Sequence, residues 1–226
     1  MHTSPGTFFR GLLPFFCLIF GVFSASFANT VRINEVMASN GATIADEDGD
    51  YEDWIELYNY GSEPVDLTGW GLSDNPGSPF KWSFPAGTSI GPDDYLLVWA
   101  SGKDRSGDVL HTNYAIAAAG EALVLSQAEG VVIDAMDPVV MPRDVSYGRA
   151  PDQGAAWFFF DEPTPGGANT TTAYAGVTER PAFSQPAGFY AAGFDLQITH
   201  PDADAVIYYS TDGSDPDPAA VGGAIL

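Results

Sequence analysis

Seven carboxylates crowd the stretch between positions 46 and 56, a density typical of metal-binding loops and catalytic clusters: Asp46, Glu47, Asp48, Asp50, Glu52, Asp53 and Glu56. Asp46, Asp48 and Asp50 hold alternate positions, like the first ligands of an EF-hand calcium loop. That loop needs glycine at its sixth position and glutamate at its twelfth, where this chain has Tyr51 and Leu57. We expect no EF-hand. A looser calcium site at Asp46, Asp48 and Asp50 and a solvated acidic loop both stay open.

Paired carboxylates could instead act as the acid and base of a glycosidase, which needs them about 5 to 10 Å apart across a cleft. Glu35 in "INEVMASN" and Glu56 in "DWIELYN" stand among apolar neighbours in strand-like sequence. A carboxylate in such a place is more often a hydrogen-bonded structural acceptor, because acids are rarely buried unpaired. We therefore predict no catalytic residue in this chain.

No other residue set matches a catalytic or cofactor motif. His111 and His200 lie far apart and lack a zinc-binding His-x-x-x-His spacing, and Ser101 is outside a G-x-S-x-G elbow. No phosphate-binding G-x-x-x-x-G-K-[ST] loop occurs. The single cysteine, Cys17, falls in a leader that we expect to be removed. We predict no cofactor apart from the calcium left open above.

The charge balance excludes several partners. Formal net charge is -22, from 30 acidic against 8 basic residues. Affinity for nucleic acid and for anionic lipid comes from Lys and Arg, so neither is expected as a partner. Because 45% of residues are hydrophobic and 13% aromatic, the chain should fold rather than stay disordered. We expect a monomer that binds a protein or a carbohydrate.

Residues 1–28 have the pattern of a secretory signal peptide. Arg10 precedes an apolar stretch at 11–23, and small residues lead to an expected cleavage between Ala28 and Asn29. The apolar stretch is short for an uncleaved membrane anchor. We therefore predict a secreted or cell-surface protein with no membrane span after cleavage.

Short strands separated by turn residues fill the next part of the chain. Runs rich in β-branched and aromatic residues, bounded by Gly, Pro, Asn or Asp, occur at 31–38, 53–59, 80–84, 95–100, 121–127, 131–136 and 157–160. In the second run, Ile55 and Leu57 should face one way and Trp54, Glu56 and Tyr58 the other. No window keeps helical spacing over several turns. The pattern predicts an all-β sandwich or barrel.

The domain organisation changes after position 160. Residues 161–176 lose hydrophobic periodicity and gain Gly, Pro and Thr, which predicts a linker at 170–179. A second β unit should span 180–226, with strand patterns in "GFYAAGFDLQITHP" and "AVIYYSTDGSDPDP". Some 45 residues without a disulfide are too few for a stable sandwich, so we expect this unit to be incomplete.

Six blocks closely resemble the bacterial lamin tail domain, in order: "INEVMASN", "DEDGDYEDWIELYNYGSEPVDLTGWGLSD", "KWSFPAGTSIGPDDYLLVWASGKD", "AGEALVLSQAEGVVID", "VSYGRAPD" and "EPTPGGAN". The resemblance implies an immunoglobulin-like β-sandwich over 29–169. It makes "DWIELYN" a framework strand, "DLTGWGLSD" the next turn and strand, and the acidic residues a connecting loop. No catalytic residue carries over, nor does the chromatin association of nuclear lamins, because this chain is acidic and lacks a coiled-coil rod.

From residue 180 the chain looks like the C-terminal β-sandwich module of chitobiase and β-hexosaminidase-type proteins, without the final strands. Both resemblances imply non-catalytic modules. In bacteria, the lamin tail domain accompanies hydrolase, nuclease or spore-coat-protein-H-like kinase domains in secreted or surface proteins. We expect modules for adhesion, presentation or interaction at the N-terminal end of a multidomain bacterial protein. The alternative is the accessory region of a secreted enzyme whose catalytic domain lies beyond residue 226.

Overall fold

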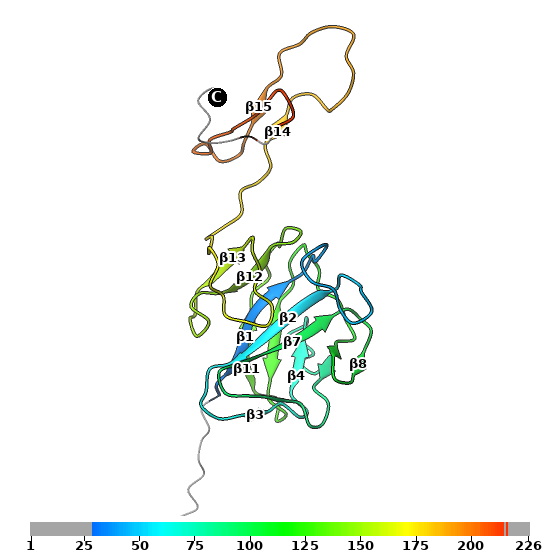
Figure 1. The fold of residues 1–226 in the computed structure, drawn as a ribbon, viewed down its shortest axis with the longest axis vertical. Helices are drawn as coiled ribbons and strands as arrows, with labels where there is room; N and C mark the ends of the chain where they lie inside the picture. Colours follow the sequence, from blue (N-terminus) through cyan, green and yellow to red (C-terminus); the bar gives the residue numbers. More distant parts are fainter. Residues whose placement is uncertain (1–28, 215, 217–226) are drawn as a thin grey trace, which may run out of the picture.

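A computed structural model describes residues 29–214 and 216, and the predicted signal peptide lies outside this range (Figure 1). The described residues form strands and loops and contain no helix, and hence no helix able to cross a membrane. The strands in chain order are β1 (Val31–Met37), β2 (Asp53–Asn59), β3 (Val65–Asp66), β4 (Gly71–Ser73), β5 (Trp82–Ser83), β6 (Ser89–Ile90), β7 (Asp94–Ala100), β8 (Arg105–Ser106), β9 (Leu110–His111), β10 (Leu123–Ser126), β11 (Val132–Met136), β12 (Ser146–Arg149), β13 (Trp157–Phe160), β14 (Ala182–Phe183) and β15 (Ile198–Thr199).

Two sheets form the main body. The larger has seven strands in the order β13-β12-β1-β2-β7-β9-β8, and the smaller has four in the order β11-β10-β4-β5. Neighbouring strands are antiparallel except β7 and β9, which pair in parallel at Trp99 and His111. The fold is therefore all-β, as the sequence predicts.

The main core fills the space between these two sheets. Ile55 and Leu57 of β2 pack in one buried cluster with Leu72 of β4 and Leu125 of β10. Burying each such side chain contributes about 1.5–3 kcal/mol. The predicted alternation along β2 is confirmed, because Trp54 belongs to a separate cluster with Met37 and Trp99 on the other face of the seven-stranded sheet.

Hydrogen bonds and an ion pair connect the two sheets near a β-bulge in β1. The pairing of β1 with β2 shifts between Ile33 and Glu35, and next to this shift the backbone groups of Ile33 bond side chains of other strands. Asp134 of β11 accepts the Ile33 N–H at 2.8 Å. The same carboxylate binds Arg149 of β12 at 2.8 and 3.0 Å, and the Arg149 guanidinium lies over the Trp157 ring. A buried ion pair thus joins opposite layers of the sandwich.

The chain beyond residue 174 forms little regular structure. Its strands are β14 and β15, which pair with each other over two residues each. "QITH" of the first predicted pattern contains β15, but "AVIYY" forms no strand. A strand needs a partner for its backbone N–H and C=O groups, and the described part of this unit offers none to that segment.

Candidate functional site

The acidic loop between β1 and β2 is closed by its own backbone. Asp46 is buried, and its Oδ1 accepts the N–H groups of Asp48 at 2.9 Å and Asp50 at 3.0 Å. The N–H of Asp46 donates to the carbonyl of Asp50 at 2.9 Å, and Gly49 takes the positive φ of 87° that this turn requires. The turn holds three alternate carboxylates on a compact loop.

Lys103 forms ion pairs with those carboxylates. Its ammonium contacts Asp46 directly and lies 3.2 Å from Asp48, 2.8 Å from Asp50 and 3.3 Å from Glu52. The structure therefore brings together the three residues that the sequence singles out for calcium, with carboxylate oxygens within 4.8 Å of one another. Hydrogen bonds to Asp46, and then to Asp50, hold the pKa of Lys103 well above its usual value. The loop thus contains a cation supplied by the chain itself.

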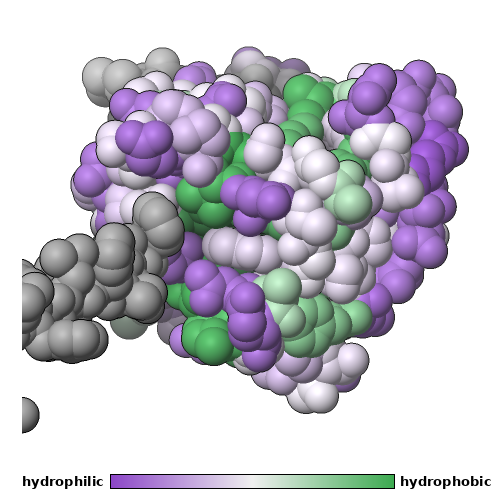
Figure 2. Space-filling view, turned by 90° about the horizontal axis from the view of Figure 1, so that it is seen from below, coloured by the Kyte–Doolittle hydropathy of each residue, from purple (hydrophilic) through white to green (hydrophobic). Residues whose placement is uncertain are grey.

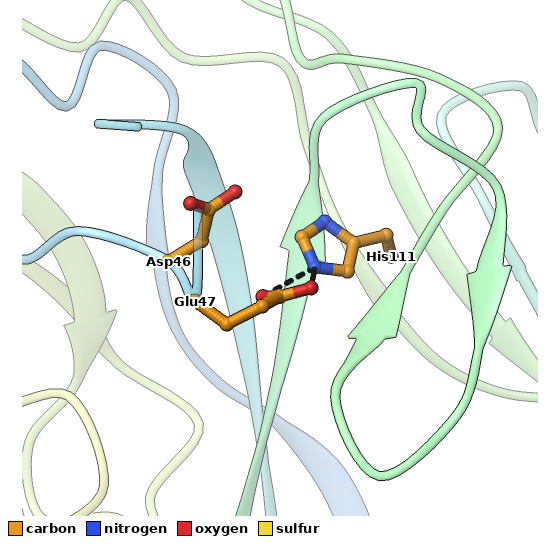
Figure 3. Close-up of side chains that lie close together, drawn as sticks. All are labelled: Asp46, Glu47 and His111. Atoms are coloured by element: carbon orange, nitrogen blue, oxygen red, sulfur yellow. Dashed lines mark hydrogen bonds and ion pairs between the residues drawn. The ribbon is translucent and has the colours of Figure 1, made fainter. Parts of the chain in front are cut away.

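A buried histidine joins this loop to β9. His111 Nε2 lies 2.9 and 3.1 Å from the carboxylate oxygens of Glu47, and its Nδ1 lies 2.9 Å from Ser101 Oγ. Figure 3 shows the Glu47 carboxylate bonded to the imidazole, with the Asp46 carboxylate beside them and not bonded to the ring. Arg105 also binds Glu47, at 2.7 Å. Sequence reasoning set His111 aside, because Glu47 is 64 residues away and only the fold brings them together.

The Ser101–His111–Glu47 chain differs from a hydrolase triad. In that triad the serine bonds Nε2 and the carboxylate bonds Nδ1, the reverse of this arrangement. Ser101 Oγ also accepts the backbone N–H of Lys103 at 3.2 Å, and His111 is fully buried. Asp46, Glu47 and His111 together offer nitrogen and oxygen atoms that suit a divalent metal. Lys103 pairs with Asp46, and Arg105 pairs with Glu47.

Glu35 and Glu56 are fully buried and lie opposite each other on β1 and β2. Glu35 accepts hydrogen bonds from Ser146 Oγ at 2.5 Å and from the Thr164 N–H at 3.2 Å. Glu56 accepts from Asn34 Nδ2 at 2.9 Å and from the Gly166 N–H at 2.5 Å. Both are buried hydrogen-bond acceptors, as expected for acids among apolar neighbours.

Burial dominates the electrostatics of this pair. Burial, with a smaller contribution from the nearby Glu35, raises the pKa of Glu56 to about 8 against the hydrogen bonds from Asn34 and Gly166. Burial also raises the pKa of Glu35, although Ser146 and Thr164 donate to it. The protein thus holds two buried acids beneath the loop that contains Thr164 and Gly166.

An open groove lies at the end of the sandwich that contains β3. It has a volume of about 640 Å³ and is lined by the start of β1, the turn after β2, and residues near β4 and β10: Asn29, Thr30, Gly61, Ser62, Glu63, Pro64, Val65, Asp66, Trp70 and Gln127. Figure 2 shows hydrophobic surface between hydrophilic side chains on this end. A volume in this range suits a small ligand or a short segment of a larger one.

Comparison with known proteins supports the sandwich assignment. The family model described as the Lamin Tail Domain matches residues 24–139, which is more than half of the chain. The match ends before β12 and β13, which extend the seven-stranded sheet. A search of curated proteins found no match. The groove, the acidic loop and the buried acid pair therefore belong to an immunoglobulin-like β-sandwich, and the chain is a member of the lamin tail domain family.

Proposed function

We propose that this chain is a non-catalytic, monomeric module of an exported bacterial protein and that it serves adhesion or presentation by holding a protein or a carbohydrate. The groove beside Trp70 is the observation that supports this proposal. The buried acids argue in the same direction, because each one already has a structural partner.

The chemistry of the groove favours an uncharged, hydroxyl-rich ligand. Within the described residues, no hydrogen bond occupies the side chains of Ser62, Glu63 or Gln127, so these groups are free to bind. Val65 and Trp70 give an apolar floor. The lining includes Glu63 and Asp66 but no Lys or Arg, which disfavours anions. A glycan meets these conditions.

Several features of the longer protein also belong to this proposal. The signal peptide is cleaved after Ala28, and the mass of the exported chain should show Asn29 as its first residue. The unit from 180 is part of a chitobiase C-terminal-type module. The alternative is an accessory region of a secreted hydrolase, nuclease or kinase whose catalytic domain lies beyond 226. Exposed aromatic residues in the unit from 180, among them Phe183 and Phe194, support this alternative.

Binding arrays of glycans and of peptides test the proposed function. The chain from Asn29 should retain a glycan class, and Ser62→Trp, which places an indole in the groove, should abolish retention. The control Glu129→Gln alters an exposed acid outside the groove lining and should bind like the wild type. Equal binding by Ser62→Trp and the wild type would contradict the proposal, as would chemical conversion of the retained glycan by this chain.

For the acidic loop we propose a structural role in which Lys103 is the cation. A calcium ion held by Asp46, Asp48 and Asp50 is the alternative, and it would have to displace the Lys103 ammonium.

A further inference from the structure

Residues 161–173 form a strap over the outer face of the seven-stranded sheet. The strap begins after β13 and returns to it, because Phe159 and Tyr174 exchange two backbone hydrogen bonds of 2.9 Å. The yellow-green segment after β13 passes beside β1 and β2 (Figure 1). Its N–H groups at Thr164 and Gly166 donate to Glu35 and Glu56, respectively. The two buried glutamates therefore hold the strap in place.

Polar groups from every neighbouring element face this pair: Asn34 of β1, Tyr95 of β7, Ser146 of β12, Asp152 of the following loop, and Thr164 and Asn169 of the strap. Asp152 accepts the Tyr95 hydroxyl at 2.5 Å and the Asn169 N–H at 3.1 Å. Within the described residues, no Lys or Arg side chain donates to either glutamate. Two negative charges here would therefore repel each other and Asp152 without a neutralising cation.

Asn34 supplies a place for a proton. Its Nδ2 donates to Glu56 Oε1 at 2.9 Å, while its Oδ1 is buried without a hydrogen-bond partner. Rotating this amide by half a turn lets Oδ1 accept an O–H from protonated Glu56. Glu56 Oε2 still accepts the Gly166 N–H. Protonation of Glu56 thus lets the Asn34 oxygen accept a hydrogen bond after the rotation, and Nδ2 then takes the position that the oxygen held.

We propose that the strap is a proton-linked latch, closed when Glu56 is protonated and Glu35 ionised, and opened when Glu56 loses its proton. Because burial raises the pKa of Glu56 from its ordinary 4.5 to about 8, the neutral form favours the closed strap. The stabilisation is fully present below about pH 4.5 and is lost as pH rises through about 8. Alkaline conditions therefore release residues 161–173, which lead into the second unit.

Amide hydrogen exchange of the full chain without its leader tests the latch. After correction for intrinsic exchange, protection of the Thr164 and Gly166 amides should fall on the order of tenfold per pH unit between about pH 4.5 and 8 and should level off above pH 8. Core amides of β2 should not follow this titration. Glu56→Gln, a neutral isostere, should keep strap protection constant across this range, and Glu129→Gln should behave like the wild type. Protection independent of pH in the wild type, or an unchanged titration in Glu56→Gln, would overturn the latch.

A second measurement on the wild type covers the case in which Glu56→Gln does not fold. The side-chain carboxyl carbon of Glu56, followed by NMR, should titrate near pH 8, the pH at which the fall in protection of the strap amides levels off. Titration of that carbon at the ordinary value for glutamate, or a fall in protection that levels off at a different pH, would equally overturn the proposal.

Discussion

Asp46 and Glu56 are both buried acids, yet their surroundings favour opposite protonation states. Burial raises the pKa of Asp46, but hydrogen bonds from the Lys103 ammonium and from two backbone N–H groups outweigh it, so the pKa lies below its usual value. Glu56 accepts hydrogen bonds from two neutral N–H groups and from no cation. The effect of burial therefore exceeds that of the hydrogen bonds, and the pKa of Glu56 is raised. A carboxylate therefore stays ionised in this fold where a cation and several donors meet it.

The role of Lys103 gives a prediction about calcium. In the wild type, melting curves with EDTA, with calcium and with salt-matched sodium should differ only by ionic screening, because the ammonium occupies the space among the carboxylates. Lys103→Met should melt at a lower temperature and should gain a calcium-specific stabilisation. At a hundredfold excess over the dissociation constant this gain is about 2.7 kcal/mol, or several degrees.

Two pairs of substitutions distinguish a loop whose cation is Lys103 from a loop that binds calcium. Asp48→Asn with Asp50→Asn should remove any calcium shift, whereas Glu129→Gln with Asp137→Asn, which changes two exposed acids outside the loop, should not. A calcium shift in the wild type that the first pair removes would show that calcium displaces Lys103, and the metal site would replace our interpretation.

The sequence was enough to single out the acidic residues, but it did not predict which side chains bind them. The apolar neighbours of Glu35 and Glu56 were enough to predict buried acceptors, because alternation along a strand is local. Lys103 and His111 lie more than fifty residues from Asp46 and Glu47, and only the parallel pairing of β7 with β9 brings His111 to the loop. No spacing along the chain encodes such a contact.

At the scale of elements, the tie between β1, β11 and β12 determines how the two sheets are joined. Asp134 is half of a nearly buried ion pair, with 16% of its side chain exposed against 6% for Arg149. Removing one partner of such a pair leaves the other charge buried and unpaired. The same carboxylate also accepts the Ile33 N–H at the bulge.

Asp134→Ala should therefore reduce the free energy of unfolding by about 3 kcal/mol, measured by urea denaturation. The control Arg143→Ala breaks an ion pair with Asp144 in which the Arg143 side chain is 71% exposed, and it should change stability by less than about 0.5 kcal/mol. Similar effects from both variants would show that the inter-sheet pair contributes no more than a surface contact.

Strands with strong β-forming residues and clear flanking turns were predictable, and strands without them were not. The runs at 53–59 and 157–160 match β2 and β13 at both ends, because each has strong β-forming residues and clear flanking turns. The run at 80–84 contains only β5, of two residues. β8, β9 and β12 were missed: "RS", "LH" and "SYGR" have little intrinsic strand preference and pair because neighbouring strands offer them a ladder.

At the scale of the whole molecule, burial separates two parts of the chain. The core residues all lie between Val31 and Phe160, whereas no described residue from 175 onward is buried. A segment without buried side chains gains little from folding to offset its loss of conformational entropy. We expect a fragment of residues 29–176, which keeps the Phe159–Tyr174 pair, to unfold cooperatively on heating, and the fragment 177–226 to show no transition. A cooperative transition in the C-terminal fragment would contradict this division.

The central claim is that this lamin tail domain holds a ligand in the groove beside Trp70 and uses its acids for structure. Mapping the amide chemical shifts of the full chain during titration with the array-selected glycan tests it most directly. The shifts should change at residues 29–30, 61–66, 70 and 127 and stay constant at Glu35, Glu56 and His111. Changes centred on Glu35 and Glu56 or on the Glu47–His111 cluster, with the groove unaffected, would contradict the account.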